Sequence, residues 1–298
     1  SEPAEAVAWI EKNNRFPIVV KADGLALGKG VLICSDLEAA KDAVKEIMED
    51  KVFGASGSRV VVEEFLTGPE VSVLAFTDGH CVKPMVSSKD HKRALDNDEG
   101  LNTGGMGTIS PNPYYTDAIA EECMNTIFLP TIEAMKREGR PFKGCLYFGL
   151  MITPDGPKVI EYNARFGDPE TQVVLPRLKT DFVDIVMAVV EERLAELPIE
   201  WSDEACACVV MASGGYPGHY EKGIPIEGLD ENGQVDGAVV YHAGTALRDG
   251  KFVTNGGRVL GVTATGETLP EALKKAYEAV GRIHWEGVHF RHDIGVIK

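Results

Sequence analysis

Hydrophobic residues along the chain switch between the spacing typical of helices and the spacing typical of strands. Over 37–49, apolar positions recur every three or four residues, which predicts an amphipathic helix with Asp36 as its N-cap. Similar segments predict further helices over 3–13, 116–137, 181–197 and 269–283. Runs rich in β-branched residues predict strands over 18–21, 31–34 and 59–65. The mixture indicates an α+β protein.

Turn signals divide the strands of the middle region into two hairpins. Asp78-Gly79 and the run 154–157 (PDGP) each lie between two strand-like segments. Between the hairpins, residues 87–113 are polar and rich in glycine, and they are too long for a simple connection, so we expect a binding loop there. The predicted strands of the hairpins are 70–77 with 80–85 and 146–153 with 158–163.

These elements group into three predicted units. Residues 1–67 form a first unit with a glycine-rich loop, and 68–204 form a second unit built largely of hairpins. Residues 205–298 form a small α+β domain at the C-terminal end. A chain of 298 residues is long enough for two or three such units.

Charge and cysteine usage narrow the classes of partner. The formal net charge of −16 argues against nucleic acid and anionic membranes as partners, because such a surface repels phosphate groups. No apolar stretch approaches the roughly 20 residues that span a bilayer, and the first residues lack the pattern of a secretory signal. The six cysteines are dispersed, which favours a protein of the reducing cytoplasm. Cys206 and Cys208 lie in an apolar strand-like run, which favours a buried strand over a metal or redox site.

A glycine-rich loop follows the first predicted strand in VVKADGLALGKGV (19–31). Glycines let backbone N–H groups approach phosphate oxygens, and Lys21 and Lys29 supply positive charge. The spacing differs from that of a Walker P-loop, and Gly30 stands where a magnesium-binding Ser or Thr would be required. The loop alone is equally compatible with an ordinary hairpin turn that carries solvated lysines.

Two later segments carry further candidate chemistry. In VVVEEFLTGPE (60–70) a strand ends at a Gly-Pro break, where backbone groups and an acidic side chain can read a purine; a domain hinge is the alternative. In VIEYNAR (159–165) strand alternation places Glu161, Asn163 and Arg165 on one face. The two oxygen-bearing side chains suit magnesium, and Arg165 suits a phosphoryl group; a solvated polar face is the alternative.

Taken in order, these three motifs resemble the ATP-grasp superfamily, whose members hold ATP between two α+β subdomains. RFGDPETQ (165–172), SSKDHKR (87–93) and NTGGMG (102–107) resemble the glycinamide ribonucleotide synthetase (phosphoribosylamine–glycine ligase) family, and so does the C-terminal run NGGRVLGVTA. The resemblance covers essentially the whole chain. It implies an ATP-grasp fold with 1–67 as a lid subdomain, 68–204 as the core subdomain, and a C-terminal domain.

The resemblance also implies how ATP is bound. Lys21 would contact the phosphates, while Glu161 and Asn163 would hold Mg²⁺, for which Mn²⁺ is expected to substitute. The preceding strand has no acid around 148–150, which argues against a second tightly held metal ion. The other implied ATP-binding residues are Gly28, Lys29, Gly30, Glu63, Glu64, Phe65, Leu66 and Glu70.

The implied reaction joins glycine to 5-phosphoribosylamine through glycyl phosphate, with ATP as phosphoryl donor, in purine biosynthesis. Lys21, Arg165 and Asp168 would act in catalysis. The alternatives are another ATP-grasp carboxylate–amine ligase and a nucleotide-binding module without catalysis. Members of the family begin with a further domain of roughly 100 residues, so we expect a complete protein to carry one. The residues implied to face the substrates are Asp90, His91, Lys92, Arg93, Asn102, Gly104, Gly105 and Arg165.

Overall fold

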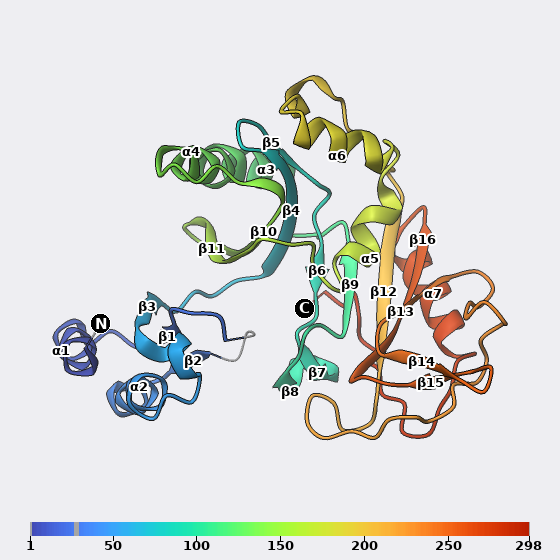
Figure 1. Ribbon diagram of the computed structural model, residues 1–298, viewed down its shortest axis with the longest axis horizontal. Coiled ribbons are helices and arrows are strands. Elements are labelled where there is room, and N and C mark those ends of the chain that lie inside the picture. Colours follow the sequence, from blue (N-terminus) through green and yellow to red (C-terminus); the bar gives the residue numbers. More distant parts are fainter. Residues whose placement is uncertain (1, 27–29, 298) are drawn as a thin grey trace. The chain divides into compact units, whose positions relative to one another are not determined.

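The structure is a computed structural model that describes residues 2–26 and 30–297. It divides into two compact units, Ser1–Thr67 and Gly68–Lys298 (Figure 1). Each unit has its own hydrophobic core. No helix among the described residues is long and apolar enough to span a membrane.

The first unit is a three-stranded antiparallel sheet packed against helices. The strands have the order β2-β1-β3, so β1 pairs with both neighbours. Asp36 caps α2 by accepting from the Ala39 N–H at 2.9 Å, as predicted, and the helix continues into a π-helical turn over Lys45–Glu49. The elements are α1 (Pro3–Asn13), β1 (Ile18–Ala22), β2 (Val31–Cys34), α2 (Leu37–Val44), a 3-10 turn (Gly54–Ser58) and β3 (Val60–Glu64).

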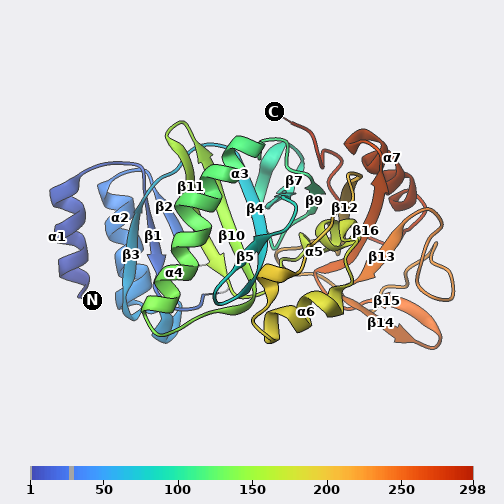
Figure 2. The ribbon, with the colours of Figure 1, turned by 90° about the horizontal axis from the view of Figure 1, so that it is seen from above.

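The second unit contains a four-stranded antiparallel sheet of order β11-β10-β4-β5. Its strands are β4 (Glu70–Asp78), β5 (Val82–Pro84), β10 (Lys143–Thr153) and β11 (Gly156–Asn163), which confirms the two predicted hairpins. One face packs against α3 (Asp117–Cys123) and α4 (Leu129–Arg137), which lie along the sheet in Figure 2. A π-helical turn over Met124–Phe128 joins these two helices, so together they correspond to the single helix predicted over 116–137.

The other face of this sheet packs against α5 (Thr171–Val174) and α6 (Phe182–Val190). Helix α6 is shorter than the predicted 181–197. Glu192 adopts a φ of 59°, so the chain turns back there, and only a 3-10 turn over Leu194–Glu196 follows. A second 3-10 turn, Leu175–Arg177, extends α5.

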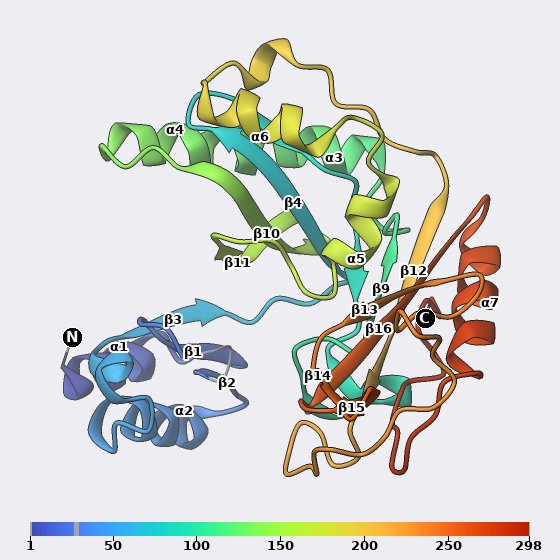
Figure 3. The ribbon, with the colours of Figure 1, turned by 45° about the vertical axis from the view of Figure 1, so that its right-hand side comes forward.

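The unit also contains a five-stranded antiparallel sheet of order β13-β16-β12-β9-β6, with α7 packed against it (Figure 3), and the two-stranded sheets β7-β8 and β14-β15. Its strands β6 (Lys89–Asp90) and β9 (Gly107–Ser110) come from the predicted loop 87–113, which also contains β7 (Arg93–Leu95), a 3-10 turn (Asp96–Asp98) and β8 (Glu99–Asn102). The sheet therefore crosses the predicted boundary at 204/205, and that boundary stays a prediction. The remaining elements are β12 (Ala205–Ala212), β13 (Val239–His242), β14 (Thr245–Arg248), β15 (Lys251–Thr254), β16 (Arg258–Gly266) and α7 (Leu269–Val280).

Candidate active site

The four-stranded sheet presents a row of polar side chains on one face. Gly149 on β10 lies opposite Ser72 on β4 and opposite Glu161 on β11, while Tyr147 lies opposite Asn163. Because paired residues on neighbouring strands point to the same side, all four polar side chains share this face. A Cβ at Gly149 would lie 3.0 Å from Glu161 Cγ, so the glycine leaves room for the carboxylate.

Glu161 and Asn163, the residues predicted to hold magnesium, lie next to each other. Asn163 Nδ2 donates to Glu161 Oε1 at 3.2 Å, and Glu161 is exposed. Among the described residues there is no cluster of three or more His, Cys, Asp or Glu side chains suited to a metal ion. A pair of oxygen-bearing side chains nevertheless fits Mg²⁺, which retains waters and phosphate oxygens as its other ligands. Arg165 lies beyond the end of β11, where its exposed guanidinium donates to the Phe166 carbonyl at 2.9 Å.

A buried group of charges lies beside this face. Lys92 Nζ is 2.5 Å from Asp90 Oδ2 and 3.8 Å from Glu170 Oε1, and both carboxylates are almost fully buried. Glu170 also accepts from Tyr147 Oη at 3.1 Å and from Ser72 Oγ at 3.3 Å. Burial raises the pKa of Asp90 and of Glu170. Burial alone would lower the pKa of Lys92, but the two carboxylates raise it, so the ammonium stays charged.

His91 points away from its two charged neighbours. Only 5% of it is exposed, Nδ1 donates to the Gly107 carbonyl at 3.0 Å, and Nε2 accepts from the Gly295 N–H at 3.1 Å. Burial lowers the pKa of His91 to about 4, which keeps the ring neutral. Both ring nitrogens are thus engaged within the chain. The predicted contact of His91 with a substrate is not favoured by this geometry, which gives the ring a structural role.

The amides of the glycine-rich loop 102–107 donate hydrogen bonds to other groups of the chain. The Thr103 N–H donates to the Lys92 carbonyl, the Gly105 N–H donates to Thr103 Oγ1, and the Met106 N–H donates to the His91 carbonyl. At Gly105, φ is +116°, and an added Cβ would lie 2.6 Å from Asp90 Oδ1 and 2.5 Å from Pro169 Cδ. The loop therefore packs directly on Asp90 through a position that only glycine fits.

Arg93 and Asn102 lie on the small hairpin that precedes this loop. They are paired across β7 and β8, and both are exposed. Arg93 Nη1 donates to the Gly100 carbonyl at 2.9 Å. Neither side chain joins the buried charged group, so their contact with a substrate stays a prediction.

Three of the predicted nucleotide residues of the first unit, Lys21, Glu63 and Glu64, lie on the paired strands β1 and β3. Lys21 Nζ on β1 is 2.5 Å from Glu63 Oε2 on β3. Glu64 and Phe65 are exposed, and the Gly30 carbonyl accepts from the Ala22 N–H at 2.8 Å. Leu66 is half-buried, and Glu70 is exposed at the start of β4 in the second unit. Gly28 and Lys29 lie outside the described residues.

Sequence reasoning missed four residues of this site. Glu170 stood in a recognised motif but without a role, and Ser72 and Tyr147 carried no signal beyond strand alternation. Arg258 forms an ion pair with Asp168, with Nη2 at 3.0 Å from Oδ2, and Gln172 Nε2 donates to the other carboxylate oxygen at 2.8 Å. Arg258 follows two glycines in the C-terminal run NGGR, which was the available signal.

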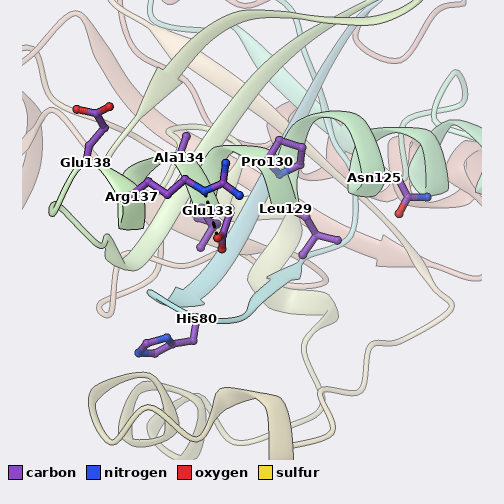
Figure 4. Close-up of a pocket in the computed structure, with 9 residues that line it drawn as sticks. His80, Asn125, Leu129, Pro130, Glu133, Ala134, Arg137 and Glu138 are labelled. Carbon is purple, nitrogen blue, oxygen red and sulfur yellow. Dashed lines mark ion pairs between the residues drawn. The ribbon is translucent and has the colours of Figure 1, made fainter.

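A separate pocket of about 570 Å³ lies against α4 and the β4–β5 turn (Figure 4). Its lining includes His80, Leu129, Glu133 and Arg137, and Arg137 Nε pairs with Glu133 Oε1 at 3.4 Å. None of the predicted site residues that the structure describes lines it. The pocket and the predicted site are therefore separate features of the described chain.

Comparison with protein families decides the assignment. Residues 1–171 match the ATP-grasp (A) domain of phosphoribosylglycinamide synthetase, and residues 206–297 match the C domain of the same enzyme. The chain belongs to the phosphoribosylglycinamide synthetase family. The family resemblance read from the sequence is thus confirmed, and with it the class of enzyme, an ATP-grasp ligase of purine biosynthesis.

Individual relatives agree with this family. The phosphoribosylamine–glycine ligase of Caldanaerobacter subterraneus subsp. tengcongensis is 50% identical over 290 residues, which cover 97% of this chain and 69% of the relative. That of Vibrio parahaemolyticus is 49% identical and is covered to 68%. The trifunctional purine biosynthetic protein adenosine-3 of Gallus gallus is 51% identical over 99% of this chain, which spans 29% of that longer protein.

Solved structures support the fold. The phosphoribosylamine–glycine ligase of Thermotoga maritima superposes with a TM-score of 0.86 at 39% identity, over 98% of this chain and 72% of that one. The biotin carboxylase domain of Hydrogenobacter thermophilus 2-oxoglutarate carboxylase gives a TM-score of 0.71 at 16% identity, over 97% of this chain and 62% of that one. That second likeness concerns the fold alone. The predicted α+β, ATP-grasp class is confirmed.

Proposed function

We propose that this chain carries the ligation of glycine to 5-phosphoribosylamine through a glycyl phosphate intermediate, with ATP as the phosphoryl donor. The observation that supports the proposal most strongly is the family match over 1–171 and 206–297. The phosphoribosylamine–glycine ligases that resemble the chain at about half of all positions name the same pair of substrates.

For nucleotide binding, we propose Lys21 as a phosphate contact, together with the loop residues Gly28, Lys29 and Gly30. Segment 63–66 and Glu70 would contact adenine and ribose. Glu161 and Asn163 would hold Mg²⁺, or Mn²⁺ in its place, because they provide two adjacent oxygen ligands on an accessible strand. When bound, the ion would neutralise negative charge on the phosphates.

In the first proposed step, a glycine carboxylate oxygen attacks the γ-phosphorus of ATP. The bond from that phosphorus to the ADP oxygen breaks, which yields glycyl phosphate and ADP. Arg165 is exposed at the end of β11, two residues beyond Asn163, and would orient the transferring phosphoryl group through its planar donors. No enzyme nucleophile is needed, so orientation and charge neutralisation supply the rate acceleration.

In the second proposed step, the amine nitrogen of phosphoribosylamine attacks the acyl carbon. The carbon–oxygen bond to phosphate breaks, phosphate departs, and the nitrogen releases one proton to solvent. Lys92 and Asp90 would contact the substrates in this step, since their buried ion pair lies beside the polar face of the sheet. The tight packing of Gly105 on Asp90 would limit the space for an acid larger than glycine.

The first step can be tested without the second substrate. Hydroxylamine captures an acyl phosphate as a hydroxamate, so the chain incubated with MgATP, glycine and hydroxylamine should produce glycyl hydroxamate and ADP in equal amounts. Alanine and β-alanine serve as control acids. Robust hydroxamate formation from other acids, with none from glycine, would instead favour a different ATP-grasp carboxylate–amine ligase.

A further inference from the structure

Arg258 connects three segments at the edge of the candidate active site. Its Nη1 donates to the carbonyls of Gly104 and Asp168, each at 2.8 Å, and its Nη2 donates to Asp168 Oδ2 at 3.0 Å. Gly104 belongs to loop 102–107, Asp168 lies in the turn after β11, and Arg258 begins β16. The side chain is 21% exposed, so these contacts are largely shielded from solvent.

A β-bulge aims Arg258 at these partners. In the pairing of β12 with β16, Met211 lies opposite Leu260 whereas Ala212 lies opposite Arg258, which leaves Val259 as the extra residue. A bulge of this kind turns neighbouring side chains away from the regular alternation of the strand. The start of β16 is therefore shaped to send Arg258 out of the sheet.

Tyr216 completes the contact on the same loop. Its hydroxyl accepts from the Gly104 N–H at 3.0 Å, while Arg258 donates to the Gly104 carbonyl. A Cβ at Gly257 would lie 2.3 Å from Tyr216 Cδ2, so Gly257 leaves the space that the ring needs. Arg258 and Tyr216 together occupy both backbone polar groups of Gly104, and we call this pair the Gly104 clamp.

We propose that the Gly104 clamp is a positioning device for ligation. It fixes loop 102–107 and the Asp168 turn relative to each other and so keeps Gly105 packed on Asp90. The inference deepens the proposed function and rests on it for its catalytic meaning. Four amides of the loop, those of Thr103, Gly104, Gly105 and Met106, already donate hydrogen bonds within the chain, so the loop acts on the site through its position. Gly105 packs against Asp90, so a shift of the neighbouring Gly104 would also move Gly105 away from Asp90.

The chemistry of the clamp favours arginine at this position. Four acceptors converge on one side chain, namely the carbonyl oxygens of Gly104, Gly105 and Asp168 and one carboxylate oxygen of Asp168. A guanidinium offers five N–H donors in a fixed plane, whereas an ammonium offers a compact charge on a flexible stem. Lysine at 258 would therefore keep the charge and part of the bonding but lose the parallel contacts.

Steady-state kinetics provide the first arm of the test. Arg258→Gln should lower kcat/KM for glycine by roughly 10- to 100-fold, because small displacements at a reacting site are costly. The Kd for MgATP should stay within about twofold of wild type, since the clamp touches none of the proposed ATP ligands. Arg258→Lys should recover part of the loss. Arg282→Gln is the control, because Arg282 is exposed and its side chain, within the part of the chain that the structure describes, donates to the Asp236 carbonyl alone.

Hydrogen exchange provides an arm that does not depend on activity. Arg258→Gln and Tyr216→Phe should each speed exchange of the amides in 102–107 by about tenfold, while β4 and β10 keep wild-type protection. Tyr216→Phe removes one hydroxyl and keeps the ring, so it tests the clamp even if the Arg258 variant does not fold. The proposal would be overturned by unchanged amide exchange in 102–107. It would also be overturned if both variants, Tyr216→Phe and Arg258→Gln, fold and keep the wild-type kcat/KM. If the wild-type chain shows no glycine-dependent ADP formation, that result would count against the proposed function alone. Hydrogen exchange of the amides in 102–107 would still test whether the Gly104 clamp holds the loop.

Discussion

Asn163 Nδ2 donates a hydrogen bond to Glu161 Oε1 over 3.2 Å, so the two predicted metal ligands already lie together on one face of β11. Replacing Glu161 with Gln removes the only negative charge of this pair. We expect Glu161→Gln to weaken the apparent affinity for Mg²⁺ by roughly 10- to 100-fold, measured by titrating Mg²⁺ in the ADP-release assay.

Tyr162→Phe is the control for that variant. Tyr162 lies between the two ligands, but it points to the opposite face, where its hydroxyl lies 3.1 Å from Thr131 Oγ1. Its loss should leave the Mg²⁺ dependence unchanged. An equal effect of both variants would mean that β11 as a whole, and not the Glu161 carboxylate, determines the metal response.

Gly105→Ala tests the packing of the glycine-rich loop on Asp90. The residue has a φ of +116°, and a methyl group would collide with Asp90 and Pro169. We expect a loss of about 1–3 kcal/mol in the free energy of unfolding, with a large fall in hydroxamate formation. Gly144→Ala has a similar positive φ of +126° but nothing within 4 Å of the added Cβ, so it should cost less stability and leave activity intact. Similar activity in the two variants would contradict a role for close packing at Gly105.

Lys21→Met tests the phosphate contact of the first unit. Loss of one charged hydrogen bond to a phosphate should raise KM for ATP by roughly 10- to 100-fold, while KM for glycine changes little. Lys12→Met is the matched control, since Lys12 is exposed in the last turn of α1. Initial rates at varied ATP measure both effects. A wild-type KM for ATP in Lys21→Met would remove Lys21 from the proposed nucleotide site.

The buried His91 predicts a pH dependence of stability. Its pKa is lowered to about 4 in the folded chain, against about 6.5 for an unperturbed histidine. The unfolded chain thus binds the extra proton first, so the contribution of the neutral ring is complete above pH ~6.5 and is lost as the pH falls towards about 4. Relative to His91→Gln, wild type should lose up to about 3 kcal/mol across this window, measured by urea unfolding. A pH-independent difference would show that His91 is not held neutral.

Most of the elements, and the shared strand face of Glu161 and Asn163, could be predicted because they depend on neighbours in the sequence. Strand alternation alone placed Glu161 and Asn163 on one face, and the capping residue Asp36 and the helix after it follow from local patterns. The predicted length of α6 was wrong because the backbone reversal at Glu192 does not change the spacing of apolar residues in the sequence.

The rest of the site depends on contacts between distant segments. His91 is buried against the Gly295 amide, 204 positions away, and Arg258 reaches Gly104 across 154 positions. Nothing in the local pattern around either residue specifies its partner. Glu170 is similar: it stands in the recognised motif RFGDPETQ, but its burial beside Tyr147 and Lys92 becomes visible only in the fold.

The central claim is that the glycine carboxylate is activated as an acyl phosphate. Glycine labelled with ¹⁸O in its carboxylate distinguishes this route, because the attacking oxygen stays with phosphorus when the acyl carbon–oxygen bond breaks. Mass spectrometry of the phosphate released during ligation should find one ¹⁸O atom per phosphate for each glycinamide ribonucleotide formed. Unlabelled phosphate alongside full product formation would contradict the account.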